Sequence, residues 1–408
     1  MKLFAQHGAS EGDKINEGFA RDLLDGVIYS PRDVSLDSLQ SKLDFLAKEY
    51  PGSERLIDPQ YYAIFLNGTE EARLGYLLEN YGDYFQARRR GQLEREKQIQ
   101  QDLTATLKFQ TGLKVTGIIA PNILIPNSLN SIEAVIAKNF IRLAAEEHRK
   151  LKDPRPLYAT LAISRNALGD KQELVEFLNE ITLLDDPPQG FYVLISARNA
   201  EARSDIYNTD VIAAWMFINH TLTVNGFEVI NGYSDMLTPF LGAAGGKAGA
   251  FGWWSNLRSF SLDRFAPAAG GGRLPIQRYL SLALLNRIAY YEFDQLRELV
   301  PGVLNKLPTD LLYNQTDPKD PKIRIGSEPQ RNMEVIQSWE AVKTLNGLLV
   351  TGEQKKSLKN CSAAVAKARM TYEAIEGVSI RLDGKSNSEH LQPLAEGLQL
   401  FNKLAELE

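Results

Sequence analysis

The sequence predicts an α/β protein built on a (β/α)8 TIM barrel. Short apolar segments alternate with amphipathic helical segments over the first 254 residues, which is typical of a parallel sheet whose connections are helices. Some segments, such as Val193-Leu194-Ile195, are apolar at successive positions, as expected for strands buried on both faces. Eight such segments favour a closed barrel, although a doubly wound open sheet gives nearly the same local pattern.

The expected strands follow one another at spacings that leave room for helices. Between them, residues 35–50, 130–150 and 170–184 place leucine, isoleucine and phenylalanine on one helical stripe. The expected strands are Leu3–Gln6, Val27–Tyr29, Arg55–Ile57, Val115–Ala120, Leu157–Ile163, Phe191–Ile195, Phe227–Ile230 and Ala248–Phe251.

The chain divides into a barrel over residues 1–255 and a mostly helical C-terminal region over residues 256–408. The connection after the third strand is long, so an insertion is expected at about residues 60–113. The C-terminal region contains an Ala/Gly stretch at Ala268–Gly272 and a loop at Asn314–Glu328. Its expected helices are Gln277–Leu299, Met333–Leu348, Gln354–Ile375 and Ser388–Leu407.

Composition and charge exclude several classes of protein. The 408 residues carry a net charge of −5, which argues against coating of nucleic acid by clustered cations. The acidity lies in the barrel, because residues 255–408 hold 20 Lys and Arg against 18 Asp and Glu. A single cysteine, Cys361, and four histidines favour a reducing compartment and predict no metal and no cofactor. No apolar leader or spanning segment is recognisable, so we expect a cytoplasmic protein without membrane contact.

Polar side chains follow nearly every expected strand. The βα loops of a barrel converge on one face, so we expect these residues to line a site there. Candidate catalytic residues are Asp58, Asp235 and His7, although Asp58 could instead start a turn and His7 could be a packed side chain. Candidate ligand-binding residues are Arg32, Gln60, Tyr61, Asn122, Arg165, Arg198, Tyr233 and Trp253.

A glycine-rich segment, Gly242–Gly252, precedes the eighth expected strand. Backbone N–H groups of such segments can hold phosphate, which makes Gly245, Gly246 and Lys247 candidate ligand-binding residues. The segment is not a Walker motif, because Leu241 takes the place of the first glycine and Ala248 that of the hydroxyl residue. Close backbone packing or a mobile lid would explain the same composition.

The order and lengths of these elements resemble the tRNA-guanine transglycosylase family. Asp58-Pro59-Gln60-Tyr61-Tyr62 keeps the acid and the aromatic residue of that family's base-recognition motif, but not its glycine pair. The family's nucleophile motif has no counterpart in Gly249–Trp254, and its zinc cysteines are absent. The resemblance implies a pocket for a purine or 7-deazaguanine-type base, with the exchange chemistry lost or relocated, and suggests a bacterial defence setting.

Three functions are therefore open. The first is binding of a purine-like or 7-deazaguanine-like base, free or on a macromolecule, with action on its linkage. The second is a barrel enzyme acting on a phosphorylated small molecule through the glycine-rich segment. The third is a non-catalytic scaffold whose helical C-terminal region docks a partner protein.

Overall fold

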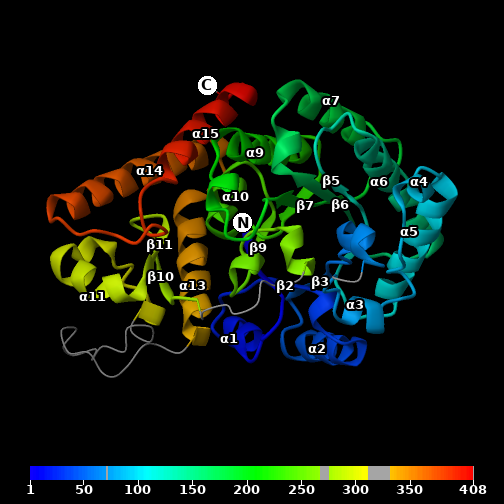
Figure 1. Cartoon of the computed structure of the whole chain (residues 1–408), viewed down its shortest axis with the longest axis horizontal. Coiled ribbons are helices and arrows are strands. Elements are labelled where there is room, and N and C mark those ends of the chain that lie inside the picture. The colour runs from blue at the N-terminus through cyan, green and yellow to red at the C-terminus, as the bar shows by residue number, and fades with distance from the viewer. Residues whose placement is uncertain (70–71, 267–274, 311–330, 408) are drawn as a thin grey trace.

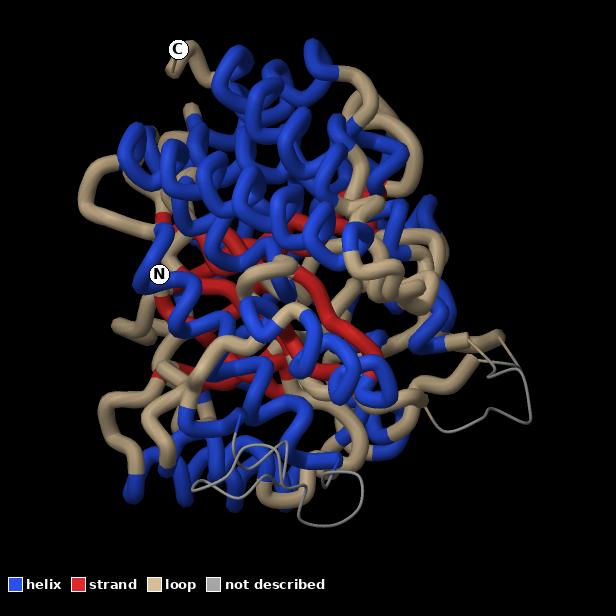
Figure 2. The backbone as a smooth tube through the Cα atoms, turned by 90° about the vertical axis from the view of Figure 1, so that its left-hand side faces the viewer, coloured by secondary structure: helices blue, strands red, loops and turns tan. Residues whose placement is uncertain are grey.

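The computed structural model describes residues 1–69, 72–266, 275–310 and 331–407, and it confirms the TIM barrel. Eight parallel strands pair in the order β3-β2-β1-β9-β8-β7-β6-β4, and helices surround them (Figure 1, Figure 2). All eight coincide with expected strands. They are β1 (Lys2–Gln6), β2 (Gly26–Tyr29), β3 (Glu54–Ile57), β4 (Ile118–Ala120), β6 (Leu157–Ser164), β7 (Gly190–Ser196), β8 (Glu228–Asn231) and β9 (Ala248–Phe251).

The seam between β3 and β4 is the place where the barrel is not closed by a strand ladder. Thr116 joins the two sides just before β4, donating its N–H to the Arg55 carbonyl (2.9 Å) and accepting the Arg55 N–H on its hydroxyl (2.8 Å). Farther along, the buried carboxamide of Gln110 accepts from the N–H of Ile119 (3.0 Å) and donates to its carbonyl (2.7 Å). Gln110 thus supplies the pair of bonds that a neighbouring strand would make.

The helices of the barrel begin where the sequence provides capping side chains. Ser131, Asp170 and Asn208 accept N–H groups of the first turns of α6, α7 and α9. The helices through residue 243 are α1 (Lys14–Ala20), α2 (Leu36–Glu49), α3 (Tyr76–Glu79), α4 (Arg90–Leu93), α5 (Glu96–Thr111), α6 (Ile132–Lys150), α7 (Lys171–Thr182), α8 (Arg203–Ile206), α9 (Thr209–Val224) and α10 (Thr238–Ala243).

The long connection after β3 contains α3, α4 and α5. Of these, α5 is the crossover helix to β4 and packs against α6. A two-residue strand, β5 (Leu124–Ile125), pairs with β6 beyond the end of β4.

The C-terminal region packs on the barrel through α1, α9 and α10. Helix α13 (Arg331–Leu349) contacts α1 and α10, and α15 (Leu391–Leu404) lies along α9, with α14 (Gln354–Gly377) against α10 and α15 (Figure 1). The buried Trp339 of α13 donates its indole N–H to the carbonyl of Phe251 at the end of β9 (3.2 Å). This region therefore shares its core with the barrel.

One expected helix of this region is wrong in its first half. Residues 277–299 form a hairpin, β10 (Arg278–Ser281) with β11 (Asn286–Ala289), and only then α11 (Tyr290–Leu299). A buried side chain of α13 pairs with the backbone of the hairpin. Gln337 accepts a hydrogen bond from the N–H of Leu280 (3.0 Å) and donates one to the Leu280 carbonyl (2.9 Å). Tertiary contacts thus override the helical pattern. The expected stretches Ala268–Gly272 and Asn314–Glu328 lie outside the described residues.

Among the helices in the described ranges, none combines the length and the apolar character that crossing a membrane requires.

Replacing Gln110 tests its part in closing the barrel. Gln110→Ala leaves the buried N–H and carbonyl of Ile119 without partners, so we expect the free energy of unfolding to fall by about 2–4 kcal/mol. The measurement is urea unfolding followed by circular dichroism. Gln101→Ala, an exposed position of the same helix, is the matched control. Equal effects of the two substitutions would contradict this part for Gln110.

Candidate functional site

The centre of the barrel's C-terminal face is filled by side chains of the chain itself. Asp58 follows β3 and is fully buried; its carboxylate accepts hydrogen bonds from Tyr62 (2.8 Å), Tyr192 (3.2 Å) and the Gln60 N–H (3.0 Å). Burial raises the pKa of Asp58 to about 6. Asp58 thus contacts tyrosines where the sequence analysis expected a ligand.

The segment after β9 covers this centre. A short 3-10 helix, Leu262–Phe265, places the Arg264 guanidinium in an ion pair with Asp33 and in hydrogen bonds to Tyr233 Oη (2.9 Å) and Ser30 Oγ (3.1 Å). Burial opposes the charge of Asp33, but the guanidiniums of Arg264 and Arg32 outweigh it and lower the pKa of Asp33. Tyr62 packs edge-on against Phe260 at 4.7 Å between ring centroids, and both side chains are buried in the middle of the mouth.

His7 lies in the same closed layer. Its Nδ1 accepts the Ser30 N–H (3.4 Å), so Nε2 carries the proton and donates to Glu11 (3.2 Å). Lys42 also pairs with Glu11, at 2.7 Å. Both ring nitrogens of this buried histidine are therefore occupied by the protein.

Three more candidate residues contact protein groups below or beside the mouth. Gln60, in the left-handed region at φ 56°, donates to Ser30 Oγ (2.9 Å) and accepts the Arg32 N–H (2.9 Å). Tyr61 donates to Asp102 (2.5 Å). Asn122 donates to the Thr160 carbonyl (2.8 Å) in the gap between β4 and β5. Each makes hydrogen bonds within the fold.

The three candidate arginines pair with neighbouring carboxylates. Arg32 binds Asp33 (2.7 Å), and Arg165 (3.3 Å) and Arg198 (2.8 Å) both bind Asp205. Asp205 is buried, and its pKa is lowered by Arg198 and Arg165 against the effect of burial. Arg198 points largely to solvent, with 63% of its side chain exposed. Asp58, Arg198 and Asp235 consequently do not converge.

The placement of Gly245, Gly246 and Lys247 at the ligand-binding face is wrong. These residues precede β9, so they lie at the end of the barrel where the strands begin. Ligands bind at the opposite end, where parallel strands end. Lys247 pairs there with Glu228 (2.8 Å) at the start of β8. Gly245 has φ +109° and lies against Thr223, so its role is close packing at the end of α10.

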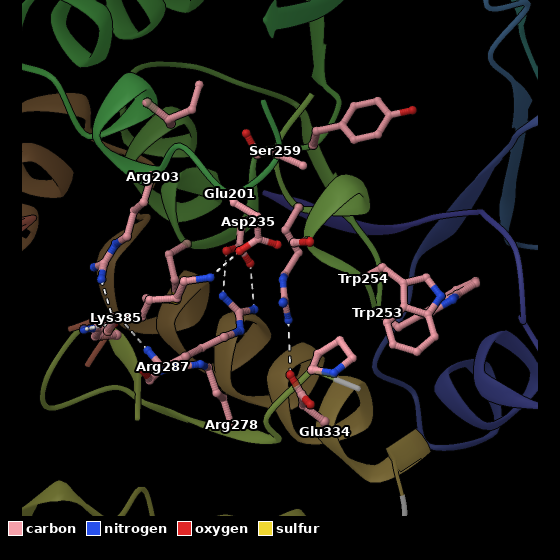
Figure 3. A pocket seen from close by; sticks show the side chains of 18 of the residues that line it. Glu201, Arg203, Asp235, Trp253, Trp254, Ser259, Arg278, Arg287, Glu334 and Lys385 are labelled. Carbon is pink, nitrogen blue, oxygen red and sulfur yellow. Dashed lines mark hydrogen bonds and ion pairs between the residues drawn. The ribbon is translucent and has the colours of Figure 1, made fainter. Parts of the chain in front are cut away.

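An open cleft of about 580 Å³ lies beside the filled centre, at the ends of β7, β8 and β9 (Figure 3). One wall comes from the loops after these strands and includes three predicted residues, Tyr233, Asp235 and Trp253. The other wall comes from the hairpin β10–β11, the first turn of α13 and residues 383–385. The site is therefore shared by the barrel and the C-terminal region.

Ion pairs join the two walls. Asp235 of the barrel accepts hydrogen bonds from both terminal nitrogens of Arg287, a residue of β11, at 2.6 and 2.7 Å. Arg258 of the barrel pairs with Glu334 of α13 (3.2 Å). Glu201 pairs with Lys385, which lowers the pKa of Glu201 against the effect of burial.

Two guanidiniums of the cleft lack a carboxylate partner among the described residues. Arg203 donates to the Lys385 carbonyl (2.8 Å) and stacks on Tyr207 at 5.0 Å, and Arg331 donates to the Pro275 carbonyl (2.9 Å). Backbone carbonyls do not neutralise a cation. In the described lining, six Lys and Arg side chains face four Asp and Glu side chains, so the cleft favours an anion.

Two adjacent tryptophans form the aromatic edge of the cleft (Figure 3). Trp253 is buried and donates its indole N–H to the Ala9 carbonyl (2.8 Å). Trp254 is partly exposed and donates to the same carbonyl (3.2 Å), which fixes the plane of its ring. A held, partly exposed indole is a surface on which a planar ring can stack.

The turn after β8 holds two residues in the left-handed backbone region, Tyr233 at φ 54° and Asp235 at φ 41°. Such conformations cost about 1 kcal/mol or more for residues other than glycine and persist where the surroundings impose them. Here the Tyr233 hydroxyl accepts from Arg264, and Asp235 is held by Arg287.

Sequence reasoning missed most of the cleft. Most of its charged residues come from the C-terminal region, far along the chain from the strand ends, and the faint signal for them was the excess of basic residues after position 254. The described lining contains no histidine or cysteine, and in the described parts of the chain no group of three His, Cys, Asp or Glu could hold a metal. The missed charged residues are Glu201, Arg203, Arg278, Arg287, Arg331, Glu334, Asp383 and Lys385.

The pH dependence of stability tests the state of Asp58. Its raised pKa means that the folded state holds the proton more tightly, so this stabilisation is present at low pH and is lost between pH 3.8 and about 6. We expect Asp58→Asn to lack that loss. Its free energy of unfolding relative to the wild type should therefore rise by about 2–3 kcal/mol between pH 4 and pH 7. The measurement is guanidinium unfolding at each pH.

The control for this pH series is Asp83→Asn, which removes an exposed carboxylate. A flat difference between Asp58→Asn and the wild type across the range would show that folding does not shift the pKa of Asp58.

Comparisons with known proteins give no family. No protein-family model matches the chain, and no curated protein matches it. Among solved structures, dihydrodipicolinate synthase from Oceanobacillus iheyensis aligns over 95% of this chain and 99% of its own, at 12% identity and a TM-score of 0.26. None of these comparisons supports the transglycosylase resemblance specifically, and the assignment of the barrel depends on the strand order itself.

Proposed function

We propose that the protein binds a small molecule with a purine-type ring in the cleft between the barrel and its C-terminal region. The observation that carries this proposal is the partly exposed Trp254 indole, held by its hydrogen bond to Ala9 at the edge of a cleft of about 580 Å³. Small-molecule sites have about this volume and combine apolar surface with a few polar groups.

The cleft replaces the base pocket expected around Asp58. Gln60 and Tyr61 were candidate ligand-binding residues, but both make hydrogen bonds within the fold. Trp254 takes the stacking role in this proposal. A 7-deazaguanine-type base, free or at an exposed position of a macromolecule, is a variant of the same proposal.

Binding, rather than action on a glycosidic linkage, is the activity that we propose. Asp235 was a candidate catalytic residue, but a bidentate guanidinium occupies both of its oxygens. A carboxylate held in this way is a poorer nucleophile, since attack would first break two charged hydrogen bonds. A defence setting remains a hypothesis of the resemblance alone.

A second candidate function, a non-catalytic scaffold, is favoured by one observation. The middle of the barrel mouth is filled by paired charges, including Asp33 with Arg264. In that case the C-terminal region would serve as a docking platform for a partner protein, and the cleft would be a site of regulation.

Isothermal titration with guanosine tests the ring proposal. We expect saturable binding by the full chain, and an affinity that is about tenfold or more lower in Trp254→Ala, because stacking of a base on an aromatic side chain contributes about 1–3 kcal/mol. Trp254→Phe should retain most of the affinity. Tyr76→Ala removes an exposed aromatic side chain elsewhere and is the control.

Absence of binding by guanosine, guanine and a 7-aminomethyl-7-deazaguanine base would overturn the ring proposal. Equal affinity in the wild type and in Trp254→Ala would overturn the role of the indole.

A further inference from the structure

Counted wall by wall, the excess positive charge of the cleft lies on the side of the C-terminal region, and after the ion pairs that cross the cleft Arg203 and Arg331 are the two cations without a carboxylate partner among the described residues. On the barrel wall, Glu201 and Asp235 balance Arg203 and Arg258. On the wall from the C-terminal region, four basic side chains face two acidic ones, an excess of two positive charges among the described residues. The basic ones are Arg278, Arg287, Arg331 and Lys385, and the acidic ones are Glu334 and Asp383.

Arg287 offers a free donor on this wall. The residue is 8% exposed, its two terminal nitrogens bind Asp235, and its buried Nε has no hydrogen-bond partner among the described residues. Buried N–H groups of charged side chains are normally paired, because leaving one unpaired costs free energy. An acceptor supplied by a ligand would satisfy this Nε.

A second guanidinium, that of Arg258, adds to the positive electrostatic potential around Arg287. Burial lowers the pKa of Arg258, and repulsion by Arg287 lowers it further. A guanidinium is so strongly basic that Arg258 keeps its charge at neutral pH. An anion between Arg258 and Arg287 would relieve this repulsion.

We infer that the ligand of this cleft carries a phosphate monoester, and that the wall from the C-terminal region binds it. The inference rests on the proposed function, to which it adds the charged part of the ligand. A phosphate monoester has a second pKa near 6 and carries about two negative charges at pH 7, which matches the excess of two. A carboxylate or a phosphodiester carries one.

Different residues of the cleft bind the phosphate and the ring of the ligand. Arg287 Nε and the donors that Arg331 does not use for Pro275 bind the phosphate oxygens, and Trp254 holds the ring. Guanidinium groups suit this task because they present several N–H donors in one plane. The predicted ligand class is a purine nucleoside monophosphate.

Titration of the protein with one nucleoside and two nucleotides, across a range of pH, tests the inference. We expect guanosine 5′-monophosphate to bind at least tenfold more tightly than guanosine at pH 7.5, and its affinity to rise between pH 5 and pH 7 as the second proton leaves. Cyclic 3′,5′-guanosine monophosphate, a monoanion, should show no such rise. Lys385 and Arg278 face Glu201 and Asp383 and lower the pKa of each carboxylate, so both remain ionised over this range.

The substitution Arg331→Gln tests the contribution of the phosphate to affinity separately from that of the ring. Arg331 is exposed and makes one hydrogen bond within the described part of the chain, to a carbonyl, so the substitution should leave the fold intact. We expect about fivefold or greater loss of affinity for the monophosphate and none for guanosine. Lys355→Gln removes an exposed charge on α14 and controls for net charge.

The outcomes are distinguishable. Equal binding of guanosine and its monophosphate overturns the phosphate inference and leaves the ring proposal standing. Binding of inorganic phosphate together with failure of every nucleoside supports the anion site and overturns the ring proposal. Failure of all ligands overturns both.

Discussion

The buried ion pair between Asp33 and Arg264 is the interaction on which the arrangement of the ligand-binding face depends. Asp33 follows β2 and Arg264 follows β9, so the pair ties the chain beyond the last strand across the mouth of the barrel. Burial opposes both charges, yet their attraction together with bonds from Ser30 and to Tyr233 keeps both ionised. A buried pair of this kind is costly to break because it leaves an unpaired charge.

Because side chains fill the centre of the ligand-binding face, the open cleft lies at the rim of that face. With Tyr62, Phe260 and Arg264 in the middle, the cleft forms where the ends of β7, β8 and β9 meet the hairpin β10–β11 and α13. The same displacement decides which charges a ligand would meet. The barrel wall is neutral in sum, and the C-terminal wall supplies the positive excess.

The C-terminal region is thus part of the site as well as part of the core. Trp339 and Gln337 of α13 bond the backbone of β9 and β10, and this fixes the hairpin that presents Arg287. The geometry of the cleft therefore depends on the packing of α13. A ligand that bridges the two walls would add its own bonds to the three ion pairs that already cross between them.

The sequence by itself determined the barrel, because the eight apolar segments and the amphipathic helical segments between them are local patterns that periodicity expresses directly. It also placed Tyr233, Asp235 and Trp253 at a shared face, since strand ends of a barrel converge. Only the tertiary structure decided that Asp58 and His7 are buried within the fold and that Lys247 lies at the opposite end. It also decided that Arg287 reaches Asp235 across 52 residues of chain. Those outcomes depend on contacts between distant segments, which no local pattern encodes.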